Sequence, residues 1–163
     1  MPPIISIVGN SNSGKTTLIE KLIPELKKRG YRVGVIKHAH HGFNIDKKGK
    51  DSWRHKVAGA DTVLVSSPGK IAMVKDEPCG SLDCLQPYFT DLDLVITEGY
   101  KREDKPKIEV FRNSLHPSSV CTNNDHLIAM VTDSEIDIEV PTFGLEAVES
   151  IVDFIENRFL KNR

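Results

Sequence analysis

Short apolar segments recur along the chain, and they are typical of strands buried on both faces of a parallel sheet. They lie at residues 4–8, 31–37, 92–97, 107–112, 127–131 and 142–143. Residues 107–112 alternate, because the polar Glu109 separates Ile108 from Val110. The last segment is expected to be short, since Pro141 just before it cannot donate a backbone hydrogen bond.

Apolar residues at helical spacing occupy two longer segments, residues 15–29 and 145–160. Gly30 is expected to end the first of these helices. Pro24 is expected to bend it, because proline lacks a backbone donor and crowds the preceding turn. A shorter helix is predicted over Ser81–Phe89, with Ser81 as its N-cap.

Two further apolar segments, Thr62–Val65 and Ile71–Val74, flank residues 66–70 and predict a β-hairpin with a five-residue loop. Elsewhere strands alternate with helices. This order predicts an α/β fold of three layers, in which helices flank a mainly parallel central sheet, with the hairpin added to it. No repeat, low-complexity tract or linker divides the chain, so a single domain is predicted over residues 1–163.

The strongest chemical signal is the pattern Gly-x-x-x-x-Gly-Lys-Thr directly after the first predicted strand. Its glycines let the backbone approach a ligand closely, and its N–H groups and the following helix N-terminus attract phosphate. The lysine reaches the β- and γ-phosphates, and the threonine hydroxyl binds Mg²⁺. The predicted nucleotide-binding residues are Gly9, Asn10, Ser11, Asn12, Ser13, Gly14, Lys15 and Thr16. A chance match is the competing explanation, but the flanking strand and helix favour a P-loop NTPase fold.

Two acidic residues follow predicted strands where this fold recognises metal and base. Glu98 lies between an apolar strand and Gly99, and it is a candidate to hold a Mg²⁺-bound water or to orient an attacking one. Asp133 offers the acceptor that the edge of guanine requires, although the usual Asn-Lys-x-Asp sequence is absent. The alternatives are a solvated turn residue for Glu98 and a turn-capping role for Asp133.

Residues 38–54 are polar and follow neither a helical nor a strand period. Potential metal ligands gather in and just after this segment, namely His38, His40, His41, Asp46, Asp51 and His55. Their spacing matches no standard zinc signature. We favour a switch-type loop that brings Lys37, His38, Asp46 and Asp51 to the γ-phosphate or Mg²⁺. A hydrated polar loop is the alternative, and His38–His41 receive no role as a group.

The composition argues against nucleic acids and membranes as binding partners. The formal net charge of −1 gives no global basic field, so no nucleic-acid partner is expected. No apolar segment approaches the ~20 residues of a membrane span and the N-terminus lacks signal-peptide features, so we expect a cytoplasmic protein without membrane contact. The three cysteines are interpreted as reduced thiols. Cys79 and Cys84 have no second pair to complete a zinc site and receive no role.

Several runs of residues together resemble the molybdopterin-guanine dinucleotide biosynthesis protein B family. The longest are GNSNSGKTTLIEKLIP at residues 9–24 and RGYRVGVIKHAHH at residues 29–41. The shorter ones are Asp46 with residues 48–52, and residues 58–61, 98–101 and 107–112. The likeness extends from Ile4 to about Phe159, nearly the whole chain.

The resemblance implies a GTP-binding adapter in molybdenum cofactor biosynthesis, with Mg²⁺ as cofactor and at most weak GTPase activity. It would assist the guanylyltransferase that converts molybdopterin to molybdopterin guanine dinucleotide. Homodimers are typical of the family, and the hairpin at residues 62–75 is a candidate for pairing between chains. The family pattern extends the phosphate-binding residues to Thr17. It makes Asp51 and Glu98 the candidates for catalysis and, with Thr16, for metal binding, while Asp133 is a weaker match.

Two other functions remain open from the residues alone. A small-molecule kinase or ATP-dependent ligase would need arginines over the γ-phosphate, and Arg102 and Arg112 are the candidates for that role. A binding module that uses nucleotide only as a structural ligand is the third class. Rapid turnover with an acceptor would identify a kinase. Partner binding that ignores nucleotide would identify a binding module.

Overall fold

The computed structural model describes residues 1–39, 42–79, 81–121 and 125–161. The chain folds into two compact units, one formed by residues 1–38 together with 81–163, the other by residues 39–80. The single domain over residues 1–163 stays a prediction.

The first unit is built on a six-stranded sheet whose order is β2-β5-β1-β6-β7-β8. The strands are β1 (Ile4–Val8), β2 (Val33–Lys37), β5 (Leu94–Glu98), β6 (Lys107–Phe111), β7 (Leu127–Thr132) and β8 (Thr142–Phe143). All five neighbouring pairs are parallel, so the carboxyl ends of the strands share one edge of the sheet. Ligands of open α/β sheets bind at such an edge.

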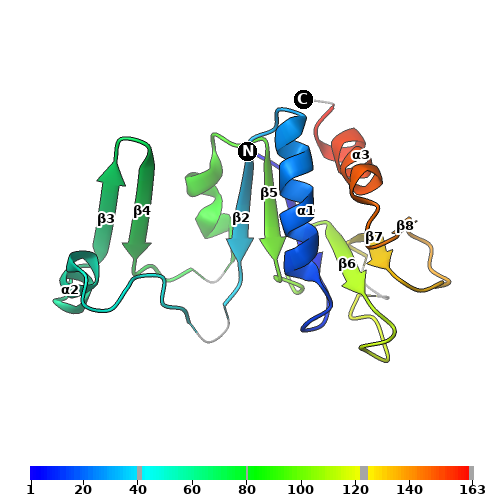
Figure 1. Cartoon of the computed structure of the whole chain (residues 1–163), viewed down its shortest axis with the longest axis horizontal. Coiled ribbons are helices and arrows are strands. Elements are labelled where there is room, and N and C mark those ends of the chain that lie inside the picture. The colour runs from blue at the N-terminus through cyan, green and yellow to red at the C-terminus, as the bar shows by residue number, and fades with distance from the viewer. Residues whose placement is uncertain (40–41, 80, 122–124, 162–163) are drawn as a thin grey trace. The chain divides into compact units, whose positions relative to one another are not determined.

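Helices cover both faces of this sheet. On one face, α1 (Lys15–Lys28) and α3 (Val148–Phe159) lie side by side and pack on Ile5 and Ile7 (Figure 1). On the other face, the 3₁₀ helix η1 (Leu82–Phe89) buries Leu82 against Val95. The predicted three-layer α/β fold is therefore confirmed. No helix in the described ranges has the length and apolar character needed to cross a membrane.

The helix boundaries differ slightly from those expected. The first helix runs through Pro24 without interruption. The carbonyl of Glu20, which loses its usual partner there, belongs to an exposed residue that water can reach. The helix predicted at Ser81–Phe89 is 3₁₀ rather than α-helical, and Pro87 inside it removes one backbone donor. The C-terminal helix begins at Val148 rather than at residue 145.

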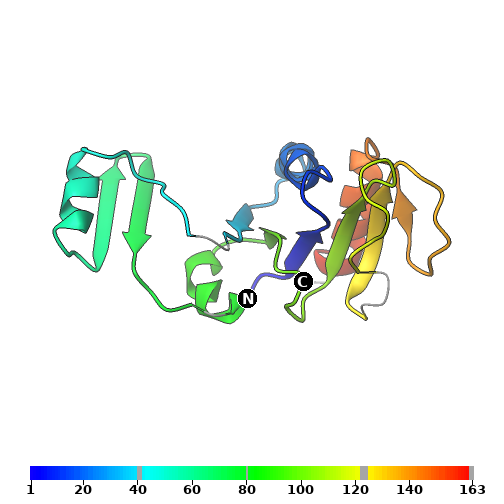
Figure 2. The same cartoon turned by 90° about the horizontal axis from the view of Figure 1, so that it is seen from below.

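The second unit contains a short helix, α2 (Asp51–Val57), beside an antiparallel hairpin of β3 (Thr62–Ser67) and β4 (Lys70–Lys75) (Figure 2). The hairpin is confirmed, but the strands leave only Pro68 and Gly69 between them, so a five-residue loop is wrong. The helix was missed because none of its residues is buried. Its sequence therefore carries no apolar stripe.

The cysteines differ from the expectation of three reduced thiols. Cys79 and Cys84 are disulfide-bonded. Cys121 is a free, buried thiol. An odd number of cysteines leaves one thiol over but does not stop the other two from pairing, so the interpretation was wrong for Cys79 and Cys84 and right for Cys121.

Candidate functional site

The loop between β1 and α1 has the backbone that phosphate binding needs. Gly9 and Gly14 have φ angles of 139° and 103°, which side-chain-bearing residues rarely adopt. A Cβ added at Gly9 would lie 2.4 Å from the backbone oxygen of Val110 on β6. Ser13 is fully buried under the loop, and its hydroxyl has no hydrogen-bond partner among the described residues. The glycine at position 9 is therefore required by both conformation and space.

Lys15 lies folded back into this loop. Its Nζ donates hydrogen bonds to the backbone oxygens of Gly9, at 3.2 Å, and Asn10, at 2.6 Å. Burial lowers the pKa of Lys15, Glu98 opposes that shift, and Lys101 and Lys37 add to it. Two carbonyl groups are weak partners for an ammonium group, so an anionic phosphate would be a better one.

Glu98 joins the loop to the neighbouring strands. It ends β5, which lies between β1 and β2 in the sheet. The hydroxyl of Thr16 donates to Glu98 Oε1 at 2.8 Å, and Lys37 Nζ lies 3.7 Å from Glu98 Oε2. The predicted neighbours Thr16 and Glu98 are thus brought together, and Lys37 joins them.

These side chains border a cavity of about 490 Å³ at the carboxyl edge of the sheet. Its lining residues are Ser11, Asn12, Gly14, Lys15, Thr16, Thr17, Lys37 and Glu98. The cavity therefore takes in most of the predicted phosphate-binding residues, including Thr17.

The residues present fit Mg²⁺. This ion prefers oxygen ligands, and it binds at phosphate sites through one or two protein groups plus waters and phosphate oxygens. Thr16 and Glu98 supply a hydroxyl and a carboxylate in direct contact. Among the residues that the structure describes, no group of three or more His, Cys, Asp or Glu side chains gathers as a separate metal site.

Asp51 belongs to the other compact unit, where it is the exposed first residue of α2 and lies 3.7 Å from Arg54. Its catalytic and metal-binding roles stay predictions. Asp46, in the same unit, accepts a hydrogen bond from the hydroxyl of Ser52 at 3.0 Å. His40 and His41 lie outside the described residues.

A segment that the sequence did not single out contacts the phosphate loop. It follows β6 and reaches the loop at two points. The Asn10 side-chain amide donates to the backbone oxygen of Ser118 at 3.2 Å, and the ring Nε2 of His116 lies 2.8 Å from the backbone oxygen of Ser11. Residues 116–118 therefore support the outer side of the loop.

Glu109 holds this segment in place. Its carboxylate is fully buried and accepts hydrogen bonds from the Ser119 hydroxyl at 2.6 Å and from the backbone N–H groups of Val120, at 2.7 Å, and Cys121, at 2.9 Å. A charged residue between the apolar residues Ile108 and Val110 was the signal that could have revealed this role. The expected alternation was incomplete, because every residue of β6 is buried.

Lys107, the first residue of β6, holds the loop that precedes this strand. It is fully buried, and its Nζ donates to the backbone oxygens of Glu103 and Lys105. Burial lowers the pKa of Lys107. The two buried charged side chains of β6 thus fix the loop before the strand and the loop after it.

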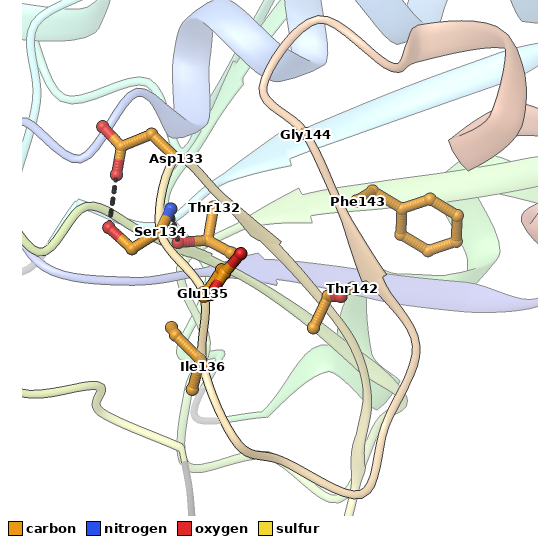
Figure 3. A pocket seen from close by; sticks show the side chains of 8 residues that line it. All are labelled: Thr132, Asp133, Ser134, Glu135, Ile136, Thr142, Phe143 and Gly144. Carbon is orange, nitrogen blue, oxygen red and sulfur yellow. Dashed lines mark hydrogen bonds between the residues drawn. The ribbon is translucent and has the colours of Figure 1, made fainter.

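A second cavity, of about 450 Å³, lies where β7 and β8 end (Figure 3). Asp133, Ser134 and Gly144 are among the residues that line it. The Asp133 carboxylate accepts from Arg112 Nε at 3.1 Å and from the Ser134 hydroxyl at 3.2 Å. The hydrogen bond from Arg112 is the main cause of the lowered pKa of Asp133. The carboxylate is therefore charged and already has two partners at the rim of this cavity.

The family model and the most extensive matches among known proteins indicate one family. The family model for molybdopterin guanine dinucleotide synthesis protein B matches residues 4–133. The molybdopterin-guanine dinucleotide biosynthesis adapter protein of Haemophilus influenzae is 42% identical over 158 residues, which cover 95% of this chain and 88% of that protein. The Escherichia coli protein of the same name is 36% identical over 161 residues, covering 95% and 92%.

Solved structures lead to the same result. A crystal structure of molybdopterin-guanine biosynthesis protein B is similar, with a TM-score of 0.78 and 36% identity over 94% of this chain and 97% of that one. The structure of Bacillus subtilis MobB has a TM-score of 0.78 and 26% identity, covering 98% and 99%. The family model extends from β1 through the phosphate loop to Asp133, just after β7. The chain belongs to the molybdopterin guanine dinucleotide synthesis protein B (MobB) family.

Proposed function

We propose that this chain is a GTP-binding adapter of molybdopterin-guanine dinucleotide biosynthesis, which binds GTP and Mg²⁺ at the phosphate loop. The observation that carries the proposal is the cavity where Lys15, Thr16 and Glu98 meet at the carboxyl edge of the sheet. The adapter role comes from the names of the relatives.

The phosphate chain of GTP would lie along the N–H groups of residues 9–14. Lys15 would exchange its two carbonyl partners for the β- and γ-phosphates. Thr16 and Glu98 would hold Mg²⁺, the Glu98 carboxylate through water. The metal supplies charge neutralisation for the phosphate oxygens.

The guanine base would be read in the cavity beside Asp133. Guanine presents two donors on one edge, its N1–H and its exocyclic amine, and a carboxylate accepts both. Because Arg112 and Ser134 already bond to this carboxylate, the base would have to share or displace one of them. Adenine lacks this pair of donors, so the arrangement favours GTP over ATP.

Hydrolysis by the isolated chain should be slow. Fast phosphoryl transfer needs a cation, often an arginine, that stabilises charge developing on the transferred phosphate. No arginine is among the described residues that line the phosphate cavity. Binding and presentation of GTP, rather than its consumption, are the tasks for which the site is equipped.

A second copy of the chain is the proposed partner of the hairpin. Leu64, Val65, Ile71 and Met73 have exposed fractions of 55, 52, 69 and 41%. A lone two-stranded hairpin is marginally stable in water, and clustered exposed apolar residues mark interaction surfaces. We propose that this homodimer acts in the cytoplasm together with the guanylyltransferase that attaches the guanine nucleotide to molybdopterin.

The test is a calorimetric titration of the purified chain with GTP and, separately, with ATP, each in Mg²⁺. We expect GTP to bind at least tenfold more tightly, a difference of about 1.4 kcal/mol. The Lys15→Ala variant, checked for folding by circular dichroism, should lose most of its affinity for both nucleotides. A preference for ATP would contradict the guanine assignment, and unchanged binding by Lys15→Ala would contradict the site itself.

A further inference from the structure

Lys37 lines the phosphate cavity although it belongs to no part of the phosphate-loop pattern. It is the last residue of β2, and in the parallel ladder it pairs with Glu98 on β5. Its ammonium group lies 3.7 Å from Glu98 Oε2, and its side chain is 68% exposed. Among the described residues, the side chain therefore has one weak ion pair, and its exposure leaves it room to move.

The charges around the cavity are unbalanced. Lys15 and Lys37 are its lining cations, and Glu98 is the lining carboxylate among the described residues. A site of this kind attracts an anion that carries more charge than Lys15 alone can balance.

Binding of Mg²⁺ would change the partner of Lys37. Glu98 now accepts the hydrogen bond of Thr16 with one oxygen and faces Lys37 with the other. A metal shell that includes Thr16 and Glu98 would draw that carboxylate charge away from Lys37. The ammonium group would then need another anion, and the terminal phosphate of a nucleotide in this cavity could supply it.

The backbone around Lys37 is fixed, so only its side chain needs to move. The N–H of His38, one residue further on, donates to the backbone oxygen of Glu98 at 3.1 Å. The ring of His38 meets the edge of Tyr100, with centroids 4.5 Å apart. Tyr100 itself has a φ of 57°, an uncommon backbone conformation for a residue other than glycine. The ladder thus holds the ends of β2 and β5 together on both sides of the Lys37–Glu98 pair.

We propose that Lys37 binds the γ-phosphate and makes this site distinguish a nucleoside triphosphate from a diphosphate. The inference rests on the proposed function, in which the cavity binds nucleotide. A flexible lysine favours binding of the triphosphate. Its charge is compensated by the additional phosphate group in the triphosphate complex and by nothing equivalent in the diphosphate complex.

The experiment compares binding of GMPPNP, a GTP analogue that resists hydrolysis, with binding of GDP, both by calorimetry in Mg²⁺. Lys37→Met should weaken GMPPNP binding at least tenfold and change GDP binding by less than about threefold. Lys37→Arg keeps the charge and should retain most of the preference for the triphosphate. The matched control is Lys27→Met, which removes the same charge from α1 about 18 Å from Lys15, beyond the screening length.

The outcomes distinguish a failure of the proposed Lys37 role from a failure of the proposed nucleotide-binding function. Equal losses for GMPPNP and GDP, or no loss for either, would overturn the role of Lys37 while leaving the nucleotide site intact. A wild-type chain that binds neither nucleotide would overturn the proposed function, and this inference with it. Because Lys37 is exposed, its replacement should leave the circular dichroism spectrum and the thermal midpoint unchanged.

Discussion

The hydroxyl of Thr16 donates a hydrogen bond of 2.8 Å to the carboxylate of Glu98, which lies 82 positions further along the chain. This contact joins the first turn of α1 to the end of β5, the two places from which a phosphate-bound magnesium ion would be held. It supports our proposal that Glu98 is the acid that helps to hold the metal.

Replacing Glu98 by Gln should therefore weaken nucleotide binding only when Mg²⁺ is present. We expect GTP affinity to fall about tenfold in Mg²⁺, because a neutral amide binds a hydrated metal ion less well. In EDTA the affinity should stay unchanged or rise, since a negative charge beside the phosphates is gone. Calorimetry with and without metal measures both values. Glu20→Gln, an exposed change on α1, is the control, and equal losses in the two buffers would contradict the metal role.

Gly9 should tolerate no side chain. In Gly9→Ala the new methyl group would meet the backbone oxygen of Val110 at 2.4 Å, in a conformation that alanine rarely adopts. We expect a loss of about 2 kcal/mol or more in the free energy of unfolding, measured with urea, together with loss of GTP binding.

Gly30→Ala separates the effect of the backbone conformation from the effect of crowding. Gly30 also has a positive φ, of 90°, but nothing within 4 Å would meet its added Cβ. The Gly30→Ala variant should lose about 1 kcal/mol of its free energy of unfolding, from conformation alone, and keep its affinity for GTP. Equal effects of the two substitutions would show that crowding against Val110 is unimportant.

The buried Glu109 should matter for both stability and binding. In Glu109→Gln one of the accepting oxygens becomes an amide group that cannot accept, which leaves a buried backbone N–H or hydroxyl without its partner. We expect unfolding to become easier by about 1–3 kcal/mol and GTP affinity to fall, because residues 116–118 lose their anchor. Ser119→Ala removes the hydroxyl donor to Glu109 and a second acceptor of the Cys121 N–H, at 3.2 Å, and should cost about 1 kcal/mol. A Glu109→Gln variant with wild-type stability would contradict this account.

Cys121 should be unreactive in the folded protein. Burial raises its pKa to about 11, so the reactive thiolate forms only at strongly alkaline pH. We expect native protein to resist iodoacetamide from pH 7 to 9. Denatured protein should take up one label per chain without reductant and three with it, because the other two cysteines are disulfide-bonded. Mass spectrometry counts the labels, and three labels without reductant would contradict the disulfide.

The exposed apolar residues of the hairpin allow a separate test of the proposed homodimer. Ile71→Glu places a charge on an exposed apolar position of β4, and it should turn the proposed dimer into a monomer in sedimentation velocity. Thr62→Glu, at an exposed polar position of the same hairpin, should leave the assembly unchanged. A wild-type chain that sediments as a monomer would contradict the proposal.

The regular parts of the fold could be predicted because their signals are local. Apolar segments such as Ile4–Val8 gave the strands, and the spacing from Leu18 to Leu26 gave α1. The phosphate loop was recognisable because its glycines and lysine have fixed positions. Helix α2 was missed because it buries no residue and so has no stripe to recognise.

The contacts that complete the site were harder to foresee. Glu109 acts on residues ten or more positions away, and Lys37 meets Glu98 only because β2 and β5 are neighbours in the sheet. Neither relationship leaves a local pattern in the sequence. Asp133 was identified by its place after a strand, but its bond to Arg112 could not be predicted, because it depends on the register of β6 and β7.

The arrangement around β6 also determines where a fluorescent reporter can be attached. Every side chain of this strand is buried, so the strand itself offers no position for a dye. Asn113 is exposed, and it lies in the segment that contacts Asn10 and Ser11 a few residues later. Since Cys121 is shielded, a cysteine introduced by Asn113→Cys could be labelled selectively without reductant. A dye there would be attached to the segment whose residues His116 and Ser118 contact the phosphate loop.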